Sequence, residues 1–185
     1  MGEMRFVRYD SRKHMDILHN IMMNSEQQYL FLGHNNINSV QEFGEWVDRQ
    51  LRGYYYNFYL IEMDEKIVGY VCGCNYNSIN RNCSLTTYIC DEWQGSGIGA
   101  LATMKYIDEF FRYHPIRRIY CEAYEYNEAS LNTIRSAGLT EYGRNPEYRY
   151  FQDKYYDLIL FSMSRDEYME KYADPFWSAE RKNER

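Results

Sequence analysis

Apolar residues follow helical spacing in some segments of the chain and strand-like runs in others. Val40, Phe43, Val47 and Leu51 recur every three or four residues, which predicts an amphipathic helix. Short runs rich in Tyr, Ile, Val and Phe between polar turns predict strands. The predicted strands are Met4–Arg8, Tyr55–Met63, Ile67–Asn75, Cys83–Cys90, Arg118–Ala123, Tyr142–Phe151 and Tyr155–Ser164. The predicted helices run from Asp10 or Ser11 to about Met23, from Val40 to Gly53, from about Ala100 to Tyr113, over Glu128–Ala137, and onward from Arg165.

Local signals support several of these boundaries. Ser39 and Glu42 have the spacing of a capping box at a helix start. Gly138 stands where a left-handed residue ends a helix. The order of helices and strands predicts a single α+β (mixed α/β) domain over residues 1–165. Residues 166–185 are expected to form a charged C-terminal helix and tail, with Phe176 and Trp177 against the body.

Composition limits the function classes. Lys and Arg number 21 against 27 Asp and Glu, a net charge of −6, which argues against nucleic acid as a partner and favours cationic ligands. The five cysteines include no C-x-x-C pair, which indicates free thiols in a reducing compartment. The four histidines lack metal-ligand spacing, so no metal is expected. Neither a signal sequence nor a membrane span is apparent, and we expect a soluble cytoplasmic protein.

The segment Gln94–Ala100 (QGSGIGA) is a glycine-rich turn between a predicted strand and a predicted helix. Such a turn lets backbone N–H groups and the helix dipole face an anion. No Lys follows the glycines, so a P-loop is excluded. Gly95, Gly97 and Ala100 also satisfy the dinucleotide pattern G-x-G-x-x-G/A, with Glu122 ending the next strand. The mid-chain position after an antiparallel meander argues against that fold, and a dinucleotide-dependent oxidoreductase remains a distant alternative.

The motif Q-x-x-G-x-G at Gln94–Gly99, the later Asn127-Glu128-Ala129-Ser130 and the closing strand Tyr155–Phe161 together resemble the GNAT family of acetyl-CoA-dependent N-acetyltransferases. The resemblance spans Met4–Ser164 and is closest to the branch of ribosomal-protein N-terminal and polyamine acetyltransferases. It implies a twisted, mostly antiparallel central sheet of six to seven strands with about four flanking helices. It also implies acetyl-CoA as cosubstrate, and a homodimer is left open.

The resemblance implies two groups of residues that contact the cosubstrate. The glycine turn would hold the coenzyme A pyrophosphate, and the preceding strand would pair its backbone with the pantetheine arm. An N–H near Ile89 would face the thioester oxygen, and Asn127 would contact the pantetheine. The implied cofactor-binding residues are Tyr88, Ile89, Cys90, Gln94, Gly95, Ser96, Gly97, Ile98, Gly99, Ala100 and Asn127.

The catalytic residues are less clearly marked. Glu122 is the candidate general base, although a solvated strand-end carboxylate is an equal interpretation, and Glu125 is a weaker rival. Many relatives carry a Tyr as general acid where this chain has Ile134. Ser130 is the candidate replacement, and the other hydroxyls available are those of Tyr126, Tyr150 and Tyr155.

The acceptor is not encoded in a motif. Small amines, amino sugars and peptide N-termini all suit an acidic, aromatic-rich chain. The loop over residues 25–38 is expected to shape the acceptor site through Tyr29, Phe31 and His34. Because Ile134 replaces the usual Tyr, a coenzyme A-binding module without turnover is the main alternative to an N-acetyltransferase.

Overall fold

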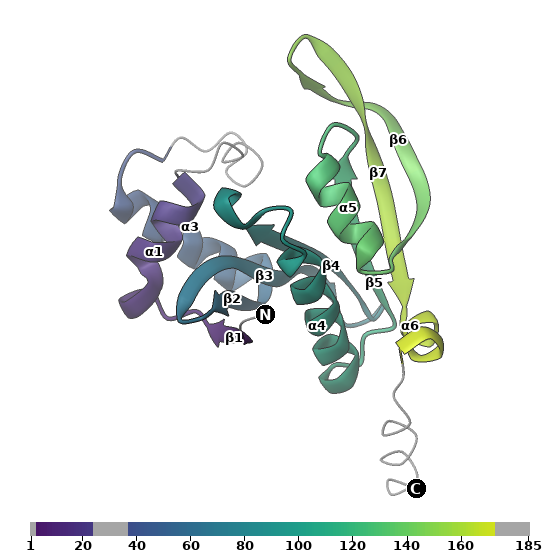
Figure 1. Ribbon diagram of the computed structural model, residues 1–185, viewed down its shortest axis with the longest axis horizontal. Helices are drawn as coiled ribbons and strands as arrows, with labels where there is room; N and C mark the ends of the chain where they lie inside the picture. The colour runs from purple at the N-terminus through teal and green to yellow at the C-terminus, as the bar shows by residue number, and fades with distance from the viewer. Residues whose placement is uncertain (1–2, 24–36, 173–185) are drawn as a thin grey trace, which may run out of the picture.

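Seven strands form one sheet in the computed structural model, which describes residues 3–23 and 37–172 (Figure 1). The strands are β1 (Met4–Arg8), β2 (Tyr55–Met63), β3 (Lys66–Asn77), β4 (Asn82–Ile89), β5 (Arg118–Tyr124), β6 (Thr140–Phe151) and β7 (Lys154–Ser164). Their order across the sheet is β1-β2-β3-β4-β5-β7-β6. Among these pairs only β4 and β5 run parallel. The expected α+β class and mostly antiparallel sheet are confirmed, and the doubly wound parallel sheet of a dinucleotide fold is not formed.

Helices cover both faces of the sheet. In the described part of the chain the α-helices are α1 (Ser11–Met23), α3 (Val40–Gly53), α4 (Ile98–Tyr113), α5 (Glu128–Ser136) and α6 (Arg165–Tyr172), and a short 3-10 turn, η1, spans Asp91–Trp93. Leu18, Phe43 and Trp46 from α1 and α3 pack with Tyr70 and Tyr88 of the sheet in one buried cluster. The larger cluster lies on the opposite face, beneath α4, α5 and α6. The molecule therefore has three layers, with the sheet in the middle.

The boundary signals in the sequence act as predicted. Ser39 Oγ accepts a hydrogen bond from Glu42 N at 3.1 Å and caps α3. The Glu42 carboxylate reaches back to Asn38 N at 2.8 Å, one residue before the position that a standard capping box uses. Gly138 follows α5 with φ of 83°. A Cβ there would also lie 2.2 Å from the Tyr172 hydroxyl oxygen, but that atom ends an exposed side chain that can move, so the left-handed conformation is what requires glycine.

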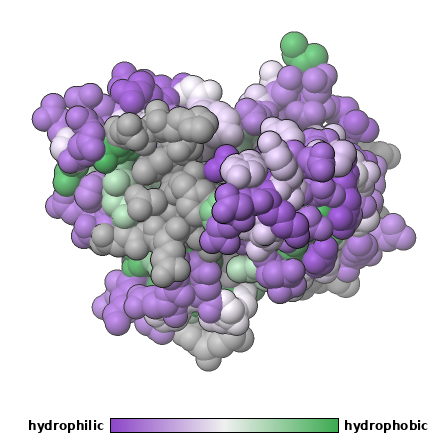
Figure 2. Space-filling view, turned by 90° about the horizontal axis from the view of Figure 1, so that it is seen from above, coloured by the Kyte–Doolittle hydropathy of each residue, from purple (hydrophilic) through white to green (hydrophobic). Residues whose placement is uncertain are grey.

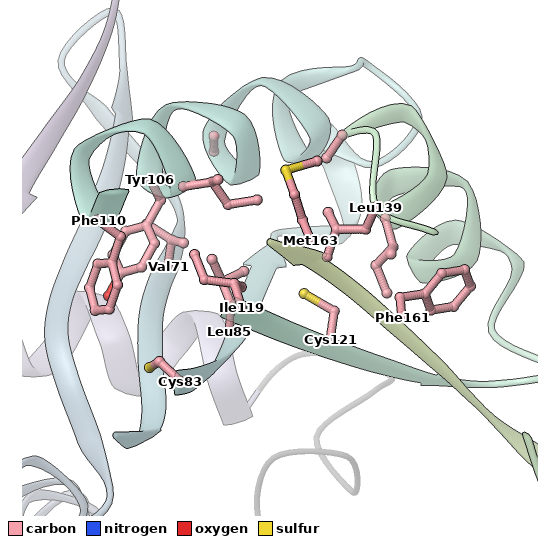
Figure 3. Close-up of a cluster of buried hydrophobic side chains, with 14 of the residues drawn as sticks. Val71, Cys83, Leu85, Tyr106, Phe110, Ile119, Cys121, Leu139, Phe161 and Met163 are labelled. Atoms are coloured by element: carbon pink, nitrogen blue, oxygen red, sulfur yellow. The ribbon is translucent and has the colours of Figure 1, made fainter. Parts of the chain in front are cut away.

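Tyr106 fixes α4 to the sheet in the larger core, which Figure 3 shows beneath the helices. The ring is 1% exposed, and its hydroxyl accepts a hydrogen bond from Gly73 N at 2.6 Å. The same hydroxyl lies 3.0 Å from Tyr56 O and 3.1 Å from Asn57 O, to which it donates. A buried phenol needs such partners. These bonds join the middle of α4 to β2 and β3.

The C-terminal elements close the larger core. Tyr168 of α6 is 6% exposed and donates a hydrogen bond from its hydroxyl to Asp108 Oδ1 of α4 at 2.6 Å. Arg165 donates to the backbone carbonyls of Phe111, His114 and Ile116. The division at residue 165 stays a prediction, and Phe176 and Trp177 lie outside the described residues.

Figure 2 shows one outer face of the molecule, seen from above. Hydrophilic residues predominate on the part of that face that the structure describes (Figure 2). Of the helices in residues 3–23 and 37–172, none is both long and apolar enough to cross a membrane.

Candidate active site

The cavity that carries the candidate site opens where β4 and β5 separate. The two strands pair only through Asn82–Arg118, Cys83–Ile119 and Ser84–Tyr120 and then diverge (Figure 1). The space between them widens into a cavity of about 580 Å³. Residues of β4, β5, α4, α5 and the closing hairpin line it, and so does the glycine-rich turn.

Every second residue at the end of β4 has its backbone N–H on the side that faces this opening. Cys90 N donates to Val68 O of β3 at 2.8 Å. Because bonded and non-bonded pairs alternate in an antiparallel ladder, Tyr88 also turns its N–H toward β3. The N–H groups of Thr87 and Ile89 therefore lie on the edge that β5 has left. Of Tyr88, Ile89 and Cys90, which are predicted to pair with a pantetheine arm, Ile89 alone has its backbone N–H on the side of β4 that faces the cavity.

Gln94 and the glycines that follow it line the cavity between the end of β4 and the start of α4. The Gln94 side-chain amide donates to Ile89 O at 3.1 Å and to Asp91 Oδ1 at 2.9 Å, so it ties the turn to the end of β4. Gly95 and Gly97 have φ of 74° and 85°, a conformation that side chains with a Cβ rarely adopt. A Cβ on either would meet no heavy atom within 4 Å, so the space over the turn is open.

The start of α4 adds free donors to that open space. The first intrahelical bond of α4 runs from Leu101 N to Gly97 O at 3.1 Å. The N–H groups of Ile98, Gly99 and Ala100 precede it, and Ser96 Oγ accepts from Ile98 N at a long 3.4 Å. Helix starts of this kind bind anions through their N–H groups and dipole. The turn at Gln94–Ala100 therefore combines open space with helix N–H groups, and its role as an anion site stays a prediction.

Sequence reasoning missed three threonines that line the same cavity, Thr87, Thr103 and Thr133. A Cβ at Gly99 would lie 3.3 Å from Thr133 Oγ1 of α5 and 3.4 Å from Ile89 Cγ1. Thr87 Oγ1 of β4 lies 2.9 Å from Thr103 Oγ1 of α4. All of these residues line the cavity. Nothing in the local pattern marks them, because their position depends on how α4, α5 and β4 meet.

Asn127 and Ser130 stand together at the start of α5. Asn127 is its N-cap, and its Oδ1 accepts from Ser130 N at 3.1 Å. Both line the cavity, and so does Ile134, which is 7% exposed and belongs to the larger core. Tyr126, Tyr150 and Tyr155 do not belong to the cavity lining. Of the hydroxyls considered as replacements for the missing Tyr, Ser130 alone is in the cavity.

Glu122 is the one charged side chain among the described residues that line the cavity. It lies on β5 two residues beyond the last pair with β4, and it retains surface exposure. Burial raises the pKa of its carboxyl above the ordinary value. Glu125, the weaker rival, is exposed outside the cavity and pairs with Arg144 at 3.9 Å.

The remaining predicted residues are placed less centrally. Tyr88 is 6% exposed, packs on the α1 and α3 side, and donates from its hydroxyl to Asp91 Oδ1 at 3.3 Å. Burial raises the pKa of the Cys90 thiol to about 11, which disfavours the thiolate. The predicted acceptor contacts Tyr29, Phe31 and His34 lie outside the described residues. Over the ranges that are described, no three His, Cys, Asp or Glu side chains gather as metal ligands.

Comparison with known proteins gives the context for this geometry. The acetyltransferase (GNAT) domain model matches residues 4–140, well over half of the chain. The SPbeta prophage-derived uncharacterized N-acetyltransferase YokL of Bacillus subtilis (strain 168) is 23% identical over 130 residues, which are 70% of this chain and 73% of YokL.

Solved structures share the fold at low sequence identity. Spermidine N-acetyltransferase from Vibrio cholerae, in complex with CoA and spermine, superposes with a TM-score of 0.77 at 19% identity, covering 90% of this chain and 98% of its own. RimL, a ribosomal L7/L12 α-N-protein acetyltransferase in complex with coenzyme A, gives 0.74 at 20% identity, with 89% and 95% covered. With the family model matched over most of the domain, the chain belongs to the GNAT family and is an acetyl-CoA-dependent N-acetyltransferase.

Proposed function

We propose that this enzyme acetylates a primary amine by direct attack on acetyl-CoA, with both substrates in the cavity between β4 and β5. The observation that carries the proposal is the meeting of an open strand edge and an open glycine turn in that cavity. The structural neighbours named for spermidine and for a ribosomal-protein N-terminus make an amine the expected class of acceptor.

The anionic part of coenzyme A would lie at Gly95–Ala100. The positive φ values at Gly95 and Gly97 and the N–H groups of Gly99 and Ala100, which precede the first bond within α4, support this position. The pantetheine arm would run along β4 and bond to the backbone of Thr87 and Ile89, in place of the strand pairing that β5 does not supply. Asn127 would contact this arm through its side-chain NH₂, because its Oδ1 already caps α5.

The reaction needs a neutral amine and a place for negative charge. The amine nitrogen attacks the thioester carbonyl carbon, the new C–N bond forms, and the C–S bond then breaks to release the coenzyme A thiolate. The Ile89 N–H would stabilise the oxyanion of the tetrahedral intermediate. Glu122, directly or through water, would take the proton that the amine loses. An alkylamine with a pKa of about 10 is almost wholly protonated at neutral pH, so this base matters.

The thiolate would take a proton from solvent as it leaves, either directly or relayed through Ser130, whose hydroxyl passes its proton to the sulfur and takes one from water. Ser130 is the cavity hydroxyl at the start of α5, and its N–H is held by the Asn127 cap. A serine is a weak acid, so we expect Ser130→Ala to cost less than the loss of the base.

Purified protein tests the proposal through coenzyme A release. The free thiol is measured with a chromogenic disulfide in the presence of acetyl-CoA and a panel of amines, beside thermal shifts with acetyl-CoA, coenzyme A and NAD. Glu122→Gln should lower kcat by about a hundredfold or more while the acetyl-CoA shift is retained. Glu125→Gln is the matched control outside the cavity and should leave kcat unchanged. A protein that neither binds acetyl-CoA nor releases coenzyme A with any amine would refute the proposal.

A further inference from the structure

The cavity wall around Glu122 combines one negative charge with phenol rings and aliphatic side chains. Strand β5 places Glu122 opposite Leu160 of β7, and Tyr124 opposite Leu158. Both leucines line the cavity. The neighbours of the carboxylate across this strand pair are therefore aliphatic.

Phenol rings complete the wall on either side of Glu122. The rings of Tyr120 and Tyr142 lie 5.9 Å apart between centroids. Tyr54 lines the same cavity as Glu122, and partial burial raises the pKa of Tyr54 to about 12, with Cys74 and the Glu122 charge acting in the same direction. Burial, Tyr120 and then Glu122 raise the pKa of Tyr142 in the same way. Phenol faces attract a cation and also bury an apolar body.

The charge count in the wall limits what it can accept. One carboxylate compensates one ammonium group. A second ammonium further along the same ligand would meet Leu158, Leu160 or a phenol face, which attracts a cation far less than a carboxylate does, and no second carboxylate lines the cavity in residues 3–23 and 37–172. An unpaired charge in such surroundings is costly.

We infer that the acceptor is a singly charged primary amine carried on an apolar or aromatic body, and that polyamines are discriminated against. This inference rests on the proposed acetyl transfer and specifies its substrate class. Glu122 would bind the ammonium before accepting its proton, and Tyr120, Tyr142 and Leu160 would contact the body of the acceptor.

A matched pair of amines tests the charge count. n-Hexylamine and 1,5-diaminopentane have the same chain of heavy atoms and differ by a terminal methyl against a second ammonium. We expect kcat/KM per amino group to be about tenfold or more higher for hexylamine. The kcat/KM for 2-phenylethylamine should equal or exceed that for hexylamine, and the kcat/KM for spermidine should be as low as that for 1,5-diaminopentane. Equal or better turnover of the diamine, of spermidine or of a peptide with a free N-terminus would overturn the inference while leaving acetyl transfer intact.

Variants at Tyr142 test the same idea from the protein side. Tyr142 is 56% exposed, so its replacement should not disturb folding. Tyr142→Asp adds a second carboxylate to the wall, and Tyr142→Asn has the same shape without the charge. The ratio of diaminopentane to hexylamine turnover should be about tenfold higher for Tyr142→Asp than for Tyr142→Asn. Identical ratios would overturn the inference, whereas no coenzyme A release with any amine, in either variant or wild type, would overturn the proposed function itself.

Discussion

Gly69 sets the position of the β4 edge that is proposed to bind the thioester. It pairs with Ile89 across the β3–β4 ladder. A Cβ at position 69 would lie 2.0 Å from Tyr88 O and 3.0 Å from Ile89 Cα, and both are backbone atoms that no rotamer change can move. Gly69→Ala therefore forces β3 and β4 apart next to the amide of Ile89.

The size of that displacement follows from the contact distances. Ordinary van der Waals contact begins near 3.4 Å, so the Cβ and Tyr88 O must separate by about 1.4 Å, the difference between 3.4 and 2.0 Å. Forced overpacking of this kind costs about 2 kcal/mol of unfolding free energy. For a chain of this length, that loss lowers Tm by roughly 4–8 °C. A shift of about 1 Å in a group that aligns the reaction costs about a hundredfold in rate.

The assay separates the two effects. Thermal melts report the stability loss, and kcat with saturating acetyl-CoA, measured well below Tm, reports the displaced amide. Gly53→Ala is the control, because a Cβ at the end of α3 would meet nothing within 4 Å. We expect the control to match wild type in both measurements. A Gly69→Ala protein with wild-type Tm and kcat would show that β4 yields without cost and would refute the reasoning.

Three further predictions follow from individual contacts. Gln94→Ala removes the hydrogen bond to Ile89 O at the end of β4 and should raise KM for acetyl-CoA by about tenfold in steady-state kinetics. Gln41→Ala is the control, because the Gln41 amide bonds to Glu45 on the exposed face of α3, and it should leave KM unchanged. Asn127→Ala and Ser39→Ala each remove a helix N-cap and should each cost about 1 kcal/mol in denaturant melts, but only the former should raise KM for acetyl-CoA. Burial raises the pKa of Glu122 in the folded protein above its value in the unfolded chain. Its favourable contribution to the free energy of unfolding is therefore complete below the pKa of the unfolded chain and is lost as pH rises through the pKa of the folded protein. Glu122→Gln should accordingly melt higher than wild type at about pH 7 and equal to it at about pH 3; a lower melting point at neutral pH would contradict this sign.

The element boundaries were predictable because short-range chemistry sets them. Strand β2 begins and ends where the aromatic run predicts, at Tyr55 and Met63. The Ser39 cap and the left-handed conformation of Gly138 depend only on residues a few positions away in the sequence. The glycine turn was recognisable for the same reason, since positive φ at Gly95 and Gly97 is a requirement of the turn itself.

The arrangement of the cavity was not predictable from local pattern. The separation of β4 from β5 after Ser84 depends on packing between segments far apart in the chain. Tyr142 and Glu122 line one cavity because β7 lies between β5 and β6 in the sheet. Ile134 takes the position where many relatives carry a Tyr, and its side chain both lines the cavity and packs in the larger core. The roles of Glu122 and Ser130 stay predictions.

The open edge of β4 explains why the strand needs strong support on its other side. Backbone groups that a neighbouring strand leaves unpaired weaken a sheet locally unless water or a ligand satisfies them. In β4 the opposite edge compensates, because the full ladder to β3 continues to Cys90 N and Val68 O. The close approach at Gly69 and the Gln94 bond to Ile89 O hold the strand end in place. A ligand arm that bonds to Thr87 and Ile89 would complete the ladder, so acetyl-CoA binding and local sheet stability should rise together.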